Sequence, residues 1–311
     1  MPQVPPATTL VAGRSVHRIG YGAMRITGLG SWGDPPNRES ARGVLRDAIR
    51  LGVNFVDTAD SYGLGVSEEI IAEALHPYPE DLVLGTKAGF IRTGPFQAQA
   101  NGRPEHLREA CEASLRRLRL ETIDLYYLHA VDPAVPLEES IGALSKLRDE
   151  GKILQVGLSN INPEQLARAQ RIVPVAAVQN RYNLAEREHE ELLRVCEGAG
   201  IAFVSWFPLL KGALAKRRNL AVRRIAAAHD ATPAQIALAW LLHRSPATVP
   251  IPGTAGLAHL RENMAAAAIA LSAEEMESLE QFRAPRRIPQ PLRNVGKRAF
   301  KYLPLLGKRG R

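Results

Sequence analysis

The chain has 311 residues, of which 45% are hydrophobic and 23% are charged, as is typical of globular proteins. No apolar run reaches the roughly 18 residues that suggest a membrane-spanning helix, and the N-terminus lacks the basic and apolar regions of a secretory signal. The two cysteines, Cys111 and Cys196, have no metal-like spacing. We therefore expect a cytoplasmic protein without a disulfide framework.

The net charge of +8 is concentrated at the C-terminus. Residues 285–311 hold nine Arg or Lys and no acid, whereas residues 1–284 hold 31 basic and 32 acidic side chains. Such a tail can contact anionic lipid or nucleic acid, but a solvated extension or a segment packed on the body is the simpler interpretation. We expect one domain over residues 1–284, a basic tail over 285–311 and no nucleic-acid partner.

Continuous apolar runs alternate with amphipathic segments along most of the chain. The stretch "TTLVAGRSV" predicts a hairpin that turns at Ala12 and Gly13. Strands typical of a parallel sheet covered on both faces are predicted at residues 17–24, 53–57, 82–87, 123–129, 153–159, 175–180, 201–207 and 247–252. Helices are predicted at residues 40–51, 67–75, 104–120, 137–150, 163–172, 186–199, 233–243 and 256–268.

Eight strands with a helix after each predict an α/β fold of the (β/α)8 type, the TIM barrel, whose usual size of about 250 residues suits this chain. The barrel would carry the N-terminal β-hairpin and the basic C-terminal extension. A doubly wound open sheet is the alternative, but no G-x-G-x-x-G pattern follows the first strand, which disfavours it.

Polar residues stand at the ends of three neighbouring predicted strands. Asp57 ends "VNFVD" with Tyr62 in the loop beyond, Lys87 ends "LVLGTK", and His129 ends "IDLYYLH". Barrel enzymes build their sites at the carboxyl ends of strands, so we expect these four side chains to form a catalytic group.

The combination favours protonation of a carbonyl oxygen. A phenol has a pKa of about 10, and a nearby ammonium such as that of Lys87 lowers it. Asp57 would hold the lysine, and His129 would orient a substrate oxygen or relay a proton. Metal binding by Asp57, Asp60 and His129 is the rival interpretation. It is disfavoured because paired ligand spacing is absent and a lysine sits in the cluster, so no metal is predicted.

These residues and the motifs after them resemble the aldo-keto reductase family from about Thr9 to Phe282. The later motifs are "VGLSN" (156–160), "VQNRYN" (178–183), "WFPL" (206–209) and "IPGTAGLAHLRENM" (251–264). Within the family, "RIGYGAM", "ALHPYPEDL", "ALAWLLHRSP" and "HLRENMAA" look most similar to bacterial pyridoxal reductases.

The resemblance implies that NADPH binds across the barrel mouth. It places the carboxamide on Ser159, Asn160 and Gln179, and an aromatic ring, here Trp206, against the nicotinamide. The implied cofactor contacts are Gly22, Ala23, Met24, Asp57, Ser159, Asn160, Gln179, Trp206, Pro208, Leu209, Lys211, Gly212, Pro252, Gly253, Thr254, His259, Glu262 and Asn263.

One departure concerns the choice of cofactor. Many members of the family place Lys or Arg among the positions of Gly253, Ala255 and His259, and this chain does not. NADH is therefore possible beside NADPH, although Arg261 is a candidate to compensate.

The resemblance implies reduction of an aldehyde or ketone, with Tyr62 as the acid. The loops 25–38 and 89–103 bring Trp32, Phe90 and Arg92 toward a small carbonyl substrate, and pyridoxal or another aromatic aldehyde would suit them. Two alternatives are an NADPH-binding redox sensor with little turnover and a lyase or isomerase that uses Lys87 as a Schiff-base nucleophile. The sequence predicts no oligomeric state.

Overall fold

The computed structural model describes residues 4–210 and 220–282. The predicted basic tail and two predicted cofactor contacts, Lys211 and Gly212, lie outside the described residues.

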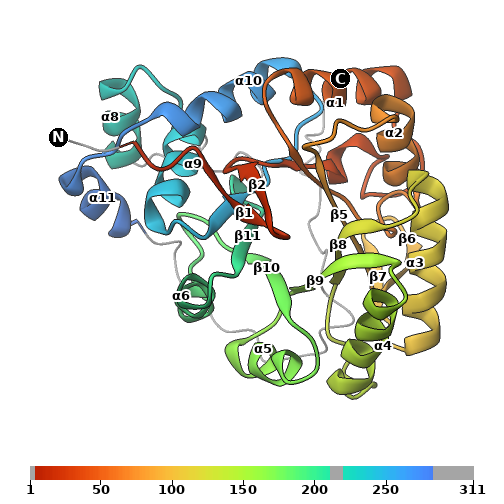
Figure 1. Cartoon of the computed structure of the whole chain (residues 1–311). Coiled ribbons are helices and arrows are strands. Elements are labelled where there is room, and N and C mark those ends of the chain that lie inside the picture. The colour runs from red at the N-terminus through yellow and green to blue at the C-terminus, as the bar shows by residue number, and fades with distance from the viewer. Residues whose placement is uncertain (1–3, 211–219, 283–311) are drawn as a thin grey trace, which may run out of the picture.

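A single parallel sheet forms the centre of the molecule (Figure 1). Its strands, in spatial and chain order, are β3 (Tyr21–Gly22), β4 (Phe55–Asp57), β5 (Val83–Ala88), β8 (Ile123–Leu128), β9 (Ile153–Ser159), β10 (Val175–Arg181), β11 (Ala202–Trp206) and β12 (Thr248–Pro250). The backbone N–H of Gly20, just before β3, donates to the carbonyl of Pro250 at 3.0 Å, which joins the two ends of this order. Spatial neighbours are thus consecutive strands, as in a (β/α)8 barrel, and the doubly wound alternative was wrong.

Helices surround the strands (Figure 1). The main ones are α1 (Arg38–Arg50), α2 (Val66–Leu75), α3 (Pro104–Leu118), α4 (Leu137–Asp149), α5 (Pro163–Gln170), α6 (Glu190–Ala199), α8 (Leu220–Ala228), α9 (Pro233–Arg244) and α10 (Leu257–Ala265). In α5 and α9, proline follows a capping residue, Asn162 or Thr232, whose side chain accepts a backbone N–H in a capping box. These caps explain why both helices begin where they do. In the described part of the chain, no helix has the length and apolar character needed to cross a membrane.

Apolar side chains from the strands fill the barrel interior. This buried cluster includes Phe55, Val83, Leu125, Tyr127, Ala177, Val204 and Val249. The predicted hairpin, β1 (Thr8–Val11) and β2 (Arg14–His17), adds Val11 and Val16 to the same cluster. The hairpin therefore packs onto the core, while the polar residues considered below gather at the carboxyl ends of the strands.

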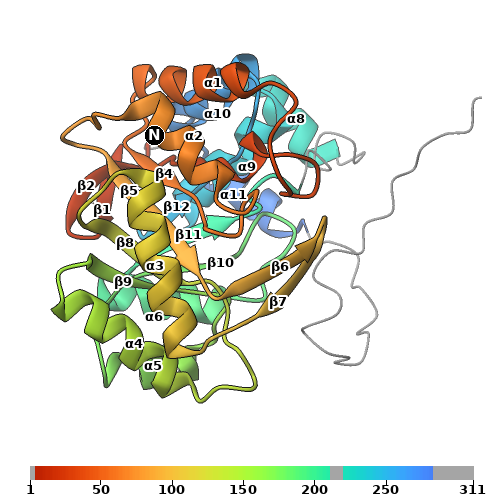
Figure 2. The same cartoon turned by 90° about the vertical axis from the view of Figure 1, so that its right-hand side faces the viewer.

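Three local predictions differ from the structure. The strand predicted at 17–24 is reduced to β3, because His17 belongs to β2 and Ala23–Ile26 forms the 3-10 helix η1. The predicted loop 89–103 contains an antiparallel hairpin, β6 (Phe90–Gly94) and β7 (Gln97–Ala100), which stands out from the barrel in Figure 2. Helices α8 and α11 (Ala273–Glu280) were not predicted, and the helix predicted at 256–268 is divided into α10 and the 3-10 helix η3 (Ala266–Ala268).

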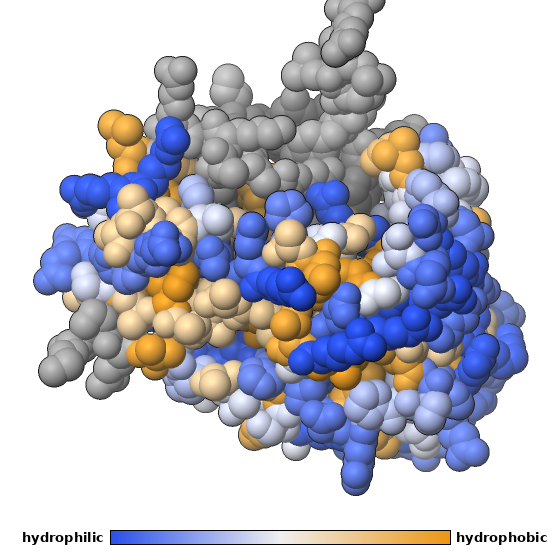
Figure 3. Space-filling model, turned by 90° about the horizontal axis from the view of Figure 1, so that it is seen from above, coloured by the Kyte–Doolittle hydropathy of each residue, from blue (hydrophilic) through white to orange (hydrophobic). Residues whose placement is uncertain are grey.

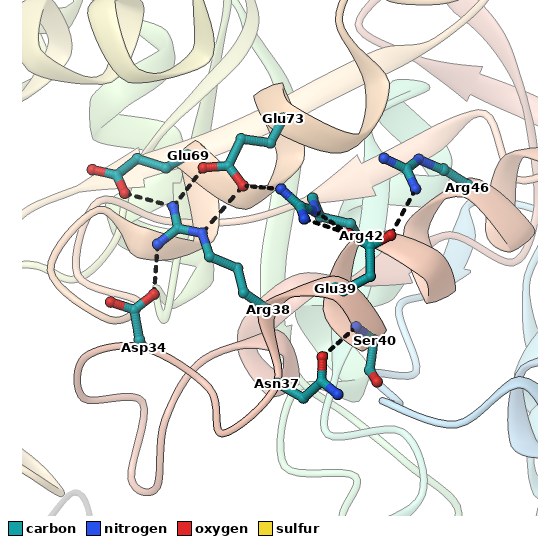
Figure 4. A network of polar contacts seen from close by, with 9 residues as sticks. All are labelled: Asp34, Asn37, Arg38, Glu39, Ser40, Arg42, Arg46, Glu69 and Glu73. Atoms are coloured by element: carbon teal, nitrogen blue, oxygen red, sulfur yellow. Dashed lines mark hydrogen bonds and ion pairs between the residues drawn. The ribbon is translucent and has the colours of Figure 1, made fainter.

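A charged network joins α1 to α2 (Figure 4). Arg38 pairs with Asp34 at 2.5 Å and with Glu69 and Glu73 at 2.8 Å, and Arg42 also reaches Glu73. Seen from above, the molecule shows a broad hydrophilic surface on the side of these helices (Figure 3). Because Asp34 belongs to the loop before α1, the network holds the end of that loop against the helix that follows Tyr62.

Candidate active site

The four predicted catalytic residues come together at the carboxyl ends of the strands. Asp57 is the last residue of β4, Lys87 lies near the end of β5, and His129 directly follows β8. The Nζ atom of Lys87 lies 5.3 Å from the centre of the Tyr62 ring. The Tyr62 and His129 ring centres are 5.9 Å apart, edge to face. The structure thus brings all four side chains into one cluster.

Lys87 and Asp57 form a buried ion pair. Their side chains are 0% and 2% exposed, and Nζ of Lys87 donates to Oδ1 of Asp57 and to the Thr58 carbonyl, both at 2.6 Å. Gln179 donates from Nε2 to the other carboxylate oxygen of Asp57 at 2.7 Å. Burial raises the pKa of Asp57 and lowers that of Lys87, while the charge of each partner opposes these shifts. Both carboxylate oxygens are thus hydrogen-bonded, which a buried pair needs in order to offset desolvation.

This pairing weakens the Schiff-base alternative. An amine nucleophile has to be neutral and free to attack. The Nζ atom of Lys87 instead donates to the Asp57 carboxylate and to the Thr58 carbonyl. It lies close to the Tyr62 ring.

The pKa of Tyr62 shifts in the direction opposite to the prediction. Burial raises it above the usual value for a phenol, the charges of Asp57 and Asp60 act in the same direction, and Arg92 acts against them. The predicted lowering was wrong for this structure because desolvation of the phenolate is the largest effect. Tyr62 therefore holds its proton at neutral pH, as a proton donor must.

His129 is a neutral imidazole at neutral pH. Burial lowers its pKa well below the usual range, and the charges of Lys87 and Arg92 lower it further. Its Nδ1 atom is buried without a hydrogen-bond partner among the described residues, and the Phe90 ring lies 4.6 Å from the imidazole. A neutral imidazole has one donor and one acceptor nitrogen, so it can orient a substrate oxygen.

His129 should also make stability depend on pH. Its folded pKa is lowered, so below the unfolded value of about 6.5 the unfolded chain binds a proton that the folded protein does not. As the pH decreases from the unfolded pKa to the folded pKa, the free energy of unfolding therefore decreases by about 1.4 kcal/mol per pH unit. Urea unfolding at several pH values below neutrality would measure this effect. As the pH decreases, the free energy of unfolding should decrease less steeply for His129→Gln than for the original protein. Equal slopes would contradict the assignment.

The residues predicted to hold the nicotinamide end lie beside this cluster. Asn160 donates from Nδ2 to the His129 carbonyl and to the Ser159 hydroxyl, both at 3.0 Å. The indole N–H of Trp206 donates to Oδ1 of Asn160 at 3.2 Å, and Gln179 contacts Asp57. The ends of β9, β10 and β11 therefore carry hydrogen-bonded polar side chains that are linked to the predicted catalytic residues.

Three of the remaining predicted cofactor contacts, Gly22, Gly253 and Thr254, lie where β3 meets the segment after β12. A Cβ atom on Gly22 would lie 2.7 Å from the Ile251 carbonyl oxygen, and one on Gly253 would lie 2.6 Å from the Gly22 carbonyl oxygen, so both positions require glycine. Tyr21 donates to the Thr254 carbonyl at 2.5 Å. The other predicted contacts are Ala23 and Met24 in η1, Pro208 and Leu209 after β11, Pro252 after β12, and His259, Glu262 and Asn263 in α10.

Helix α10 offers free backbone donors at its start. Its N-cap is Gly256, without a side-chain hydrogen bond, so the first N–H groups stay available to an anion. Within the helix, Asn263 is buried, whereas His259 and Glu262 contact each other at 3.1 Å.

Arg25 is a candidate that the sequence interpretation missed. Its Cγ atom lies 3.4 Å from where a Cβ atom on Gly253 would be. The Arg25 side chain therefore lies beside Gly253, one of the positions among which many members of the family are expected to carry Lys or Arg. Arg25 is exposed and has no ion pair among the described residues. Sequence spacing gave no signal for it, because 228 positions separate the two residues.

The predicted substrate residues come from two segments. Phe90 and Arg92 lie on β6, and Trp32 lies half-buried in the loop before α1. No group of three or more His, Cys, Asp or Glu side chains within residues 4–210 and 220–282 is placed to hold a metal ion.

Comparison with known proteins decides the family. Residues 18–284 match the model of the aldo/keto reductase family. The chain is an aldo/keto reductase. Pyridoxine 4-dehydrogenase of Escherichia coli is 42% identical over 273 residues, covering 86% of this chain and 95% of that enzyme. This match agrees with the predicted similarity to bacterial pyridoxal reductases.

Two further relatives support the assignment of the chain to the aldo/keto reductase family. An uncharacterised oxidoreductase of Schizosaccharomyces pombe is 43% identical, covering 88% of this chain and 89% of that protein. The crystal structure of an aldo-keto reductase from Klebsiella pneumoniae in complex with NADPH has a TM-score of 0.77 and 30% identity, covering 92% of this chain and 98% of that one.

Proposed function

We propose that this aldo/keto reductase reduces an aldehyde or ketone to the alcohol, using NADPH. The observation that carries the proposal is the buried Lys87–Asp57 pair beside a protonated Tyr62 and a neutral His129. Bound NADPH would supply a hydride to the carbonyl carbon. The protein's own residues then have to orient the carbonyl, exclude water and supply one proton.

In this proposal Tyr62 is the general acid. As the carbonyl carbon gains the hydride, the oxygen becomes strongly basic and takes the phenolic proton, which completes the alcohol. The tyrosinate left behind lies beside the Lys87 ammonium, which stabilises its charge. His129 orients the carbonyl oxygen through a ring nitrogen, and Asp57 keeps Lys87 in place.

The polar and aromatic side chains at the carboxyl ends of the strands fit a nicotinamide nucleotide. The Ser159 hydroxyl and the amides of Asn160 and Gln179 suit a carboxamide, which needs both donors and acceptors. The indole of Trp206, held by Asn160, provides a flat apolar surface for an aromatic ring. The uncapped start of α10 suits a phosphate.

We also propose that Arg25 favours NADPH over NADH by attracting the additional phosphate. In Arg25→Gln, NADPH should bind about tenfold more weakly, as expected for a lost charge-assisted contact, while NADH affinity changes little. Titrations monitored by tryptophan fluorescence quenching would measure both. Arg50→Gln, on an exposed part of α1, is the matched control and should bind both cofactors normally. An equal loss for the two cofactors would contradict this role for Arg25.

The substrate is proposed to be pyridoxal or another aromatic aldehyde. Phe90 beside His129 supplies an aromatic wall, and the similarity to E. coli pyridoxine 4-dehydrogenase favours pyridoxal because pyridoxine is the corresponding alcohol. A panel of pyridoxal, benzaldehydes, aliphatic aldehydes and ketones with NADPH, and in parallel with NADH, tests the proposal. Fastest oxidation of NADPH with the aromatic aldehydes is expected, and a preference for aliphatic ketones would contradict the substrate class.

A further inference from the structure

The hairpin β6–β7 turns one face toward the catalytic residues. Along β6, Phe90 and Arg92 are half-buried, whereas Ile91 and Thr93 are exposed, as expected because alternate residues of a strand share a face. The Phe90 ring packs on His129 with ring centres 4.6 Å apart. Arg92 therefore lies on the same face of the strand as a residue that contacts the catalytic histidine.

The guanidinium of Arg92 is held between the hairpin and the loop before α1. Its Nη2 atom donates to the Gly30 carbonyl and, at 3.4 Å, to the Ser31 carbonyl. The Ser31 carbonyl also accepts the backbone N–H of Gly63 at 3.0 Å, and Gly63 follows Tyr62 directly. These contacts fix the arginine beside the segment that carries the proton donor.

The positive charge of Arg92 has no counter-ion in the described part of the protein. Its hydrogen bonds go only to backbone carbonyls, and its Nε atom is buried without a partner. Burial lowers the pKa of this guanidinium, and its charge acts on both Tyr62 and His129. A partly desolvated cation with unsatisfied donors is unfavourable by itself, so a bound anion would compensate it.

We propose that Arg92 is a specificity-determining residue that binds an ionised oxygen, a carboxylate or phenolate, carried by the ring of an aromatic carbonyl substrate. This inference rests on the proposed reductase function. Charge-assisted hydrogen bonds from a planar guanidinium to an oxyanion are strong and directional. Phe90, two residues earlier on the same face, contacts the ring while Arg92 contacts the anion.

The test compares two substrates of similar shape, 4-carboxybenzaldehyde and its neutral methyl ester. Steady-state rates with saturating NADPH give the ratio of kcat/KM for the acid to that for the ester. In Arg92→Gln this ratio should fall about tenfold or more, mainly through a higher KM for the acid, since a charged hydrogen bond is lost. Arg92→Lys should keep part of the preference, and Arg50→Gln should keep all of it.

The outcomes separate this inference from the proposed function. If the original protein reduces both aldehydes and the ratio is unchanged in Arg92→Gln, Arg92 does not recognise the anion. An equal loss for acid and ester would assign Arg92 to support of the loop and would also overturn the inference. If the original protein binds NADPH but reduces neither these two aldehydes nor any other carbonyl compound of the panel, the proposed function itself fails.

Discussion

Replacing Tyr62 by phenylalanine should lower kcat/KM for aldehyde reduction by about 100- to 10,000-fold, the usual contribution of a general acid. The aromatic ring stays between Lys87 and His129, so packing is preserved while the only acidic proton of the phenol is removed. Because the role proposed for Tyr62 involves the substrate oxygen and not the carboxamide of the cofactor, NADPH affinity should change little. Stopped-flow reduction of pyridoxal and fluorescence titration of NADPH would measure the two quantities.

Tyr78→Phe is the matched control for this prediction. Its hydroxyl donates to the Leu118 carbonyl at 2.7 Å, away from the catalytic cluster, so activity should be retained. A Tyr62→Phe protein that keeps most of its activity would show that another group, His129 or water, supplies the proton.

The second large effect is expected from Lys87→Met, on stability as well as activity. Removing one partner of a buried ion pair leaves an uncompensated charge, which typically costs about 3–5 kcal/mol. Asp57 would keep the hydrogen bond from Gln179 but lose its cation, and Tyr62 would lose the ammonium that supports its ionised form. Urea unfolding should reveal the loss of stability, and turnover should become very slow.

A double variant separates these two effects. In Asp57→Asn combined with Lys87→Met, no uncompensated charge remains from the pair, so much of the stability should return while activity stays low. Arg168→Met, which breaks an exposed pair with Glu138, should have little effect on either property. Full activity in the double variant would contradict the role assigned to Lys87.

The fold and the catalytic cluster were predictable because both depend on local patterns. Each barrel strand is a short apolar run, and in parallel sheets the residue that ends the run lies at the catalytic face. Asp57, Lys87 and His129 could therefore be placed together without knowledge of tertiary contacts. Helix α11 was missed although Ser272 and Glu275 form a capping box, a signal that the sequence does contain.

Other features depend on contacts that spacing does not reveal. The hairpin β6–β7 contains Gly94 and Pro95, which are equally typical of an irregular loop. The raised pKa of Tyr62 results from desolvation in the folded protein, which outweighs the positive charge of Arg92. Arg25 reaches Gly253 only because β3 and β12 close the barrel. In each case the decisive quantity is desolvation or proximity in the folded protein.

The most direct test of the central claim is to incubate the original protein with NADPH and pyridoxal and to quantify pyridoxine against the NADPH consumed. We expect one pyridoxine, or one alcohol from the preferred aldehyde of the panel, for each NADPH oxidised. Tight binding of NADPH without its oxidation by any carbonyl compound would contradict the reductase function and favour a sensor that binds the cofactor with little turnover.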